Sequence, residues 1–415
     1  MSIFAIASIL VGLSAFFGYL NHRYLHLPHS IGLVVIALVA SLIVVVVDLM
    51  SPSLYIAQDV AGVLRKIDFN ETLMHGMLSF MLFAGGLHAN MSALKSRRWT
   101  ITAMASVGTM MSTFLIGGAM WFVFAMAGAN FPFIWALVFG ALISPTDPVA
   151  VLGLFKTVKV PDSIKATMAG ESLFNDGIGV VVFTVIVAIA VGSAGQAGEM
   201  GILTIAKLFF TEVVGGTILG LTAGYIGYRA MHGINQTSLA VLITLALVMV
   251  AYSLAIFLHL SGPIAMVVAG LFIGNQDVKY AMSNHIREGV EQFWSLMDEI
   301  LNSVLFLLIG LEVFVIADSF EHRWFAITAI PVVLAARALS VSIPILILSH
   351  WQTFKKGAVP ILIWGGLRGG IAVALALSLP ENEYKATILS ITYGVVLFSI
   401  IVQGLTIKKL IERVI

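Results

Sequence analysis

Cysteine is absent from this sequence of 415 residues, and only 10% of the residues are charged. Without cysteine the chain forms no disulfide bond, no haem attachment and no thiolate zinc or iron–sulfur site. The formal net charge of +1 argues against a basic surface for nucleic acid. The first apolar stretch also lacks a basic leader and a small-residue cleavage motif, so we expect it to remain in the protein as a helix.

Apolar residues dominate what is present. They make up 60% of the chain, and the mean hydropathy is +1.03, far above the values of water-soluble domains. A helix needs about 20 apolar residues to cross roughly 30 Å of hydrocarbon. Thirteen such stretches predict an all-α polytopic membrane protein. The predicted spans are 3–21, 30–49, 73–92, 101–128, 132–154, 169–192, 203–228, 238–258, 262–275, 294–316, 324–348, 358–379 and 385–407.

The basic residues predict the orientation of these spans, because Lys and Arg accumulate on the cytoplasmic side. With the N-terminus outside, fifteen of the 22 Lys and Arg residues fall on cytoplasmic segments and five on outer ones. The prediction is therefore an N-terminus outside, a C-terminus in the cytoplasm and no cytoplasmic regulatory domain. Residues 51–72 are predicted to form an outer loop with a short interfacial helix.

Four ionisable residues lie deep in the predicted spans: Asp147, Asp176, Arg337 and Arg368. Counted from the span ends, each is roughly 16–23 Å deep at 1.5 Å per residue. Charges at this depth are costly and commonly mark functional sites. A purely structural pairing of buried charges is the alternative.

Two of the spans contain helix-breaking motifs. Residues 144–148 read Ser-Pro-Thr-Asp-Pro, and residues 365–370 read Gly-Gly-Leu-Arg-Gly-Gly. Ordinary kinks are the alternative for either motif alone, but together they predict two unwound helices that run in opposite directions, as in an inverted repeat. The repeats would be spans 1–6 and 8–13, with span 7 as a linker. Asp147 would compensate the positive ends of half-helices and Arg368 the negative ends.

The span 169–192 opens with Gly-Glu-Ser-Leu-Phe-Asn-Asp-Gly at residues 170–177. A spacing of four places Ser172 and Asp176 on one helix face and Glu171 and Asn175 on the next. Hydroxyl and carboxylate oxygens suit Na⁺, and removal from water favours a protonated carboxyl group. One carboxylate that holds either Na⁺ or a proton would perform antiport, and Arg337 is the expected partner of Glu171.

Four motifs carry a family resemblance: residues 170–176, Thr146-Asp147-Pro148, residues 366–369 (Gly-Leu-Arg-Gly) and Ala336-Arg337. Together they resemble the monovalent cation/proton antiporters of the bacterial NhaP and animal sodium/proton exchanger branch. The resemblance implies an NhaA-like antiporter fold in which a six-helix core moves against a dimerising domain. We expect the core at about 73–192 and 294–415, and the dimerisation domain at about 1–50 and 203–275.

The resemblance also implies roles for individual residues. Asp176 would carry Na⁺ or the proton, with Ser172 and Thr146 as co-ligands and Asn175 beside it, and Asp147 belongs to the same candidate site. An asparagine-aspartate pair at 175–176 implies electroneutral exchange. Glu171 and Arg337 would form a buried ion pair. The expected protein is a homodimer in the lipid of the cell (inner) membrane that transports Na⁺ (or Li⁺) and protons, needs no cofactor and is not an enzyme.

One position departs from the family pattern. Members often carry an acid after a Leu-Phe run in the third span, where this chain has Ala84, so the site is expected to lack one carboxylate contact. K⁺/H⁺ exchange is the nearest alternative function. A channel would need repeated filter loops, and a hydrolase using Ser172 would need a histidine base at its depth. Asp298 is interpreted as an acid near a span end, and Asn302 as a cavity-lining group.

Overall fold

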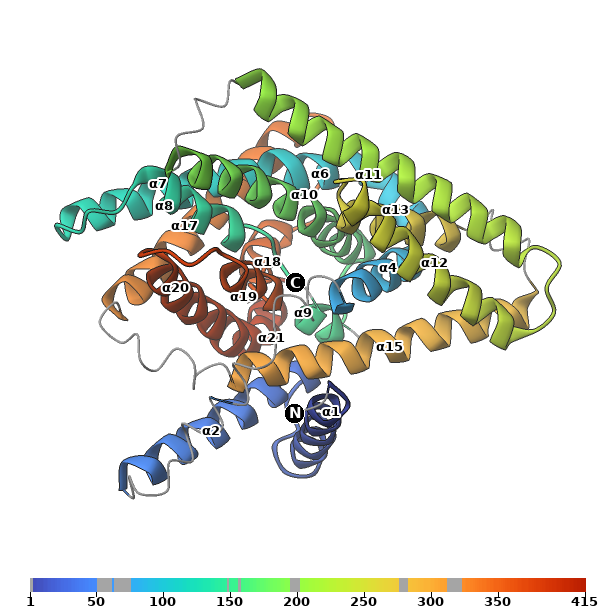
Figure 1. Ribbon diagram of the computed structural model, residues 1–415, viewed down its shortest axis with the longest axis horizontal. Coiled ribbons are helices and arrows are strands. Elements are labelled where there is room, and N and C mark those ends of the chain that lie inside the picture. The colour runs from blue at the N-terminus through green and yellow to red at the C-terminus, as the bar shows by residue number, and fades with distance from the viewer. Residues whose placement is uncertain are drawn as a thin grey trace.

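The computed structural model describes residues 3–50, 62, 76–147, 149–155, 158–194, 202–275, 283–311 and 323–415. In these residues all regular structure is helical, and nine helices are long and apolar enough to cross a membrane. Three shorter apolar helices accompany them. The chain is therefore a multi-pass membrane protein (Figure 1). Apart from Gly62, the predicted outer loop at 51–72 lies outside the described residues.

Eighteen α-helices follow one another in the described residues. In order they are α1 (Ile3–Leu20), α2 (His29–Met50), α4 (Leu78–His88), α5 (Met91–Ser96), α6 (Arg98–Thr102), α7 (Thr109–Met126), α8 (Phe133–Ile143), α9 (Val149–Leu154), α10 (Asp162–Ala194), α11 (Ile202–Met231), α12 (Thr237–Phe257), α13 (Gly262–Gly274), α15 (Asn284–Leu311), α17 (Arg323–Leu348), α18 (Ala358–Trp364), α19 (Gly370–Leu377), α20 (Lys385–Phe398) and α21 (Gly404–Val414). π-Helical segments at Asn21–Leu25, Ala103–Gly108 and Ser399–Gln403 continue α1, join α6 to α7 and join α20 to α21.

Each predicted span contains helix, but two predicted starts are wrong. Helix α10 begins at Asp162 rather than 169, and α15 begins at Asn284 rather than 294. Polar side chains such as Glu288 and Gln292 made the first part of α15 look like a loop. They lie on the exposed side of a helix whose other side buries Ile286, Val290 and Trp294. The number of membrane crossings stays a prediction.

The helices pack in two groups. One group contains α7, α8, α10, α17, α19 and α20, which pack on one another. The other contains α1, α2, α4, α11, α12, α13 and α15. In Figure 1, α7, α8, α17 and α20 lie on the left, while α11 and α15 border the molecule on the right. The division into a transport core and a dimerisation domain stays a prediction.

Helix α13 packs closely on both α4 and α11 because glycine removes side chains at the crossings. A Cβ atom on Gly270 would come within 2.3 Å of the Phe83 carbonyl oxygen in α4. One on Gly220 would come within 2.5 Å of the Ala265 carbonyl oxygen in α13. Small residues allow backbones to approach in this way. The crossing fixes α4, one wall of the cavity described below.

Candidate ion-binding site

The two predicted helix breaks are present and touch each other. Helix α8 ends at Ile143 and α9 begins at Val149, while α18 ends at Trp364 and α19 begins at Gly370. The backbone N–H of Asp147 donates to the Leu367 carbonyl at 2.8 Å, joining one unwound segment to the other. The proline and glycine motifs therefore create a crossing of two interrupted helices.

Charged side chains lie at the free ends of these half-helices. The Arg368 guanidinium donates to the carbonyls of Ser144 and, at 2.9 Å, Pro145, just beyond the C-terminal end of α8. Asp147 Oδ1 accepts from the Val149 N–H at 2.9 Å, at the start of α9. Its Oδ2 lies against Gly369, which precedes α19. These positions have the signs that compensate negative C-terminal and positive N-terminal ends.

Arg337 contacts Glu171 and a second half-helix. Its guanidinium donates to both Glu171 oxygens, with 3.1 Å between Nη2 and Oε2, and to the Leu362 carbonyl at 2.9 Å. Glu171 is 1% exposed and Arg337 6%. Leu362 lies in the last turn of α18. Arg337 therefore binds the C-terminal end of α18, just as Arg368 binds the C-terminal end of α8. Sequence reasoning missed this second contact of Arg337.

Asn175 and Thr146 are bound to each other. The Asn175 amide nitrogen donates to the Thr146 hydroxyl at 2.9 Å, and its amide oxygen accepts from the Thr146 N–H at 3.4 Å. Both residues are buried. Asn175 thereby attaches the unwound segment between α8 and α9 to α10.

A cavity of about 400 Å³ reaches the other candidate residues. Asp147, Ser172 and Asp176 all line it, so the predicted face of α10 with Ser172 and Asp176 does meet an open space. The Asp176 residue is 9% exposed, and no hydrogen bond from the described residues reaches its carboxylate. Thr146 and Asn175, also expected at the site, are not among the residues that line this cavity.

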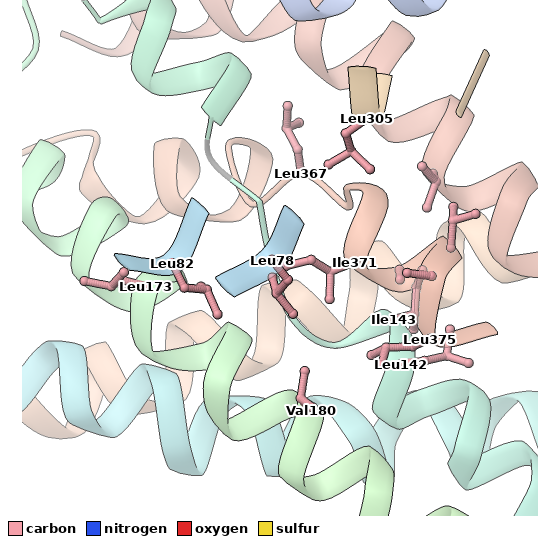
Figure 2. Close-up of a cluster of buried hydrophobic side chains, with 14 of the residues drawn as sticks. Leu78, Leu82, Leu142, Ile143, Leu173, Val180, Leu305, Leu367, Ile371 and Leu375 are labelled. Atoms are coloured by element: carbon pink, nitrogen blue, oxygen red, sulfur yellow. The ribbon is translucent and has the colours of Figure 1, made fainter. Parts of the chain in front are cut away.

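Much of the remaining lining is apolar. Leu78 and Leu82 of α4, Leu173 of α10, Leu305 of α15 and Ile371 of α19 line the cavity. Figure 2 shows these side chains as parts of one hydrophobic cluster, drawn from helices far apart in the sequence. An apolar wall strengthens the electrostatic interaction of an ion with the few polar groups present.

The cavity also contains polar residues that sequence reasoning did not assign to the site. Asp298 of α15 and His88 of α4 both line it. The His88 ring nitrogens lie 2.8 Å and 3.0 Å from the carbonyl oxygens of Ala84 and Glu291. The site therefore has a further carboxylate although the third span has Ala84 where an acid was sought. Asp298 stands near the middle of α15, and a correct start of that helix would have revealed it.

Comparison with known proteins identifies the family. The model of the transmembrane sodium/hydrogen exchanger family matches residues 12–413. The chain belongs to this family. The family consists of secondary transporters, so the protein is a transporter and not an enzyme.

Individual relatives agree with this assignment. The Na⁺/H⁺ antiporter NhaP of Pseudomonas aeruginosa is 45% identical over 409 residues, which cover 97% of this chain and 95% of the relative. The Na⁺/H⁺ antiporter NhaH of Halobacillus dabanensis is 35% identical over 390 residues, 93% of this chain and 92% of the relative. The exchanger family is therefore matched along nearly the entire chain.

A solved structure shows that the fold is shared. The sodium proton antiporter MjNhaP1 from Methanocaldococcus jannaschii superposes with a TM-score of 0.76, covering 99% of this chain and 98% of that one. The sequence identity is 18%, so this likeness concerns the fold alone.

Proposed function

We propose that the protein is a secondary Na⁺/H⁺ antiporter (with Li⁺ as a further substrate) in which Asp176 carries either the cation or the proton. The observation that carries this proposal is the cavity that reaches Asp176 and Ser172, where the carboxylate has no hydrogen bond from the described residues. A carboxylate and a hydroxyl one helical turn apart are hard oxygen ligands. The names of the two bacterial relatives, both Na⁺/H⁺ antiporters, support the same substrates.

The other buried charged side chains have partners in the protein. Asp176 is therefore the carboxylate that is available to bind Na⁺ and a proton in turn. Glu171 is paired with Arg337, Arg368 holds the end of α8, and Asp147 accepts from the start of α9. Na⁺ and a proton then alternate on one carboxylate. Asn175 adds no charge, so the proposed exchange is one for one and electroneutral.

Alternating access would occur between the two packed helix groups. Asp147, Ser172 and Asp176 belong to the group around α8 and α10, whereas His88 and Asp298 belong to the group around α13. This packing supports a moving core without α4 and α15, although the sequence placed 73–92 and 294–316 within it. The second group would form the dimer contact and remain still.

The proposed location is the cell (inner) membrane with the C-terminus in the cytoplasm. His88 lines the cavity and is exposed, and Lys95, Arg97 and Arg98 follow on the same short stretch of chain. Basic residues favour the cytoplasmic side. The cavity would therefore open toward the cytoplasm in this conformation.

The proposal is tested with purified protein in proteoliposomes that contain a pH-sensitive dye. An imposed Na⁺ gradient should move protons in the wild type, and Asp176→Asn should abolish that movement while the melting temperature stays near wild type. Asp162→Asn is the matched control, because Asp162 lies on the same helix with a side chain that is 97% exposed. Persistent exchange by Asp176→Asn would refute the assignment, and equal exchange with K⁺ would reassign the substrate.

A further inference from the structure

Asp298 lines the cavity, but the exchange cycle proposed above gives its carboxylate no role. It lines the same cavity as Asp147, Ser172 and Asp176 but comes from α15, in the opposite helix group. Its backbone and side-chain oxygens accept from the Asn302 amide at 2.9 Å and 3.0 Å. The other atom of that amide, Asn302 Oδ1, is buried without a partner in the described part of the chain, so Asp298 alone orients it.

The position of Asp298 along α15 places it between the exposed Ser295 and the buried Leu305, both of which line the cavity. Leu305 lies at the inner end, where a Cβ on Gly370 would come within 2.3 Å of its side chain. Asp298 stands seven residues before Leu305, or about 10 Å at 1.5 Å per residue. Ser295, one turn further out, is exposed, as is His88 on the facing helix. Asp298 is half-buried whereas Asp176 is 9% exposed, so Asp298 is the more accessible carboxylate for a cation that enters beside Ser295 and His88.

Electrostatics link Asp298 to the rest of the cavity. Asp298, His88 and Asp147 line one cavity, and Glu299 follows Asp298 in α15, so Asp298 belongs to the same electrostatic environment as the inner carboxylates. A carboxylate at the entrance of an apolar cavity raises the local concentration of cations. The inner Asp176, nine-tenths buried and without a hydrogen bond from the described residues, is the group that finally receives the ion.

We propose that Asp298 is a second cation-binding position, which holds incoming Na⁺ near the mouth of the cavity before the ion reaches Asp176. This inference rests on the proposed Na⁺/H⁺ exchange. Asn302 positions the carboxylate. The two carboxylates lie on opposite helix groups and have different roles. Asp298 sets the affinity with which Na⁺ is captured, and Asp176 exchanges Na⁺ for a proton.

The test measures the Na⁺ dependence of exchange in proteoliposomes. Asp298→Asn should raise the apparent KM for Na⁺ about tenfold, which corresponds to about 1.4 kcal/mol, and leave the maximal rate within about twofold. Asp298→Glu keeps the charge and should stay within about threefold of wild type. The Na⁺ concentration that half-maximally raises the melting temperature should shift with the KM, which gives a readout without transport.

Glu299→Gln is the matched control, because it removes the same charge from the next residue of α15, which is exposed and absent from the cavity lining. A wild-type KM in Asp298→Asn overturns the inference, and so does an equal shift in Glu299→Gln. Loss of all exchange by folded Asp298→Asn also overturns it, because Asp298 would then belong to the carrier site itself. If Asp298→Asn does not fold, Asn302→Ala replaces it, because Asn302 positions the carboxylate. This variant should raise the KM for Na⁺ about threefold, and an unchanged KM in Asn302→Ala would overturn the inference.

The two proposals fail in distinguishable ways. Wild-type protein without Na⁺-driven proton movement would refute the proposed function. Normal exchange by the wild type, together with an unshifted KM for Na⁺ in Asp298→Asn, would refute only the outer binding position.

Discussion

Asp147 occupies the space that Gly369 leaves by having no side chain. A Cβ atom on Gly369 would lie 2.2 Å from Asp147 Oδ2 and 2.6 Å from Asp147 Cβ. The backbone of Gly369 is extended, with φ −118 and ψ −161, so an L-residue can adopt it. The glycine is required here for room and not for its conformational freedom.

Gly369→Ala should therefore disable transport by displacing Asp147. We expect the rate of Na⁺-driven proton movement to fall at least about tenfold, since misplacement by about 1 Å in a site commonly costs that much or more. Gly153→Ala on the neighbouring α9 is the control, because nothing lies within 4 Å of its added Cβ. Proteoliposome assays compare the two variants, and wild-type exchange by Gly369→Ala would contradict the steric argument.

Glu171→Gln should destabilise the protein because it leaves Arg337 buried without its carboxylate partner. Breaking a buried pair costs about 3–5 kcal/mol, which corresponds to a fall of roughly 5 °C or more in melting temperature. The comparison is Glu381→Gln, which breaks the exposed pair with Lys385 at 2.8 Å. That change should move the melting temperature by less than about 1 °C. Equal melting curves for wild type and Glu171→Gln would argue against the pairing.

Arg368 should be sensitive to loss of charge more than to change of shape. Arg368→Gln leaves the carbonyls of Ser144 and Pro145 without a cation and should abolish exchange. Arg368→Lys keeps the charge but loses the planar donor geometry, so we expect an intermediate rate. Initial rates of Na⁺-driven proton movement rank the three proteins. Equal loss in both variants would show that the charge alone is insufficient.

Exchange should carry no net charge, because the neutral Asn175 leaves Asp176 as the carrier. On a solid-supported membrane, Na⁺ jumps should give no sustained current. An imposed potential from valinomycin and K⁺ should also leave the exchange rate unchanged. A sustained transport current would contradict a cycle in which one Na⁺ replaces one proton.

Some features of the site could be predicted from the sequence because they are local. Pro145 removes a backbone donor wherever it stands in a helix, so the break between α8 and α9 follows from the sequence itself. The glycines at 365–370 act in the same way on α18 and α19. The contact of Glu171 with Arg337 could also be anticipated, because a buried charge requires a partner and the predicted spans contain only two deep cations, Arg337 and Arg368.

Other features depend on how helices rotate and tilt against one another. Hydrophobicity sets the approximate span of a helix but not which face meets which neighbour, so the bond between Asn175 and Thr146 could not be foreseen. Asp298 was missed for a related reason, because the polar face of α15 concealed ten helical residues and made a mid-helix acid look terminal. The sequence by itself determined the all-helical membrane class, the two breaks and the buried charges. Only the tertiary structure decided which carboxylates share a cavity, because that depends on contacts between helices distant in the chain.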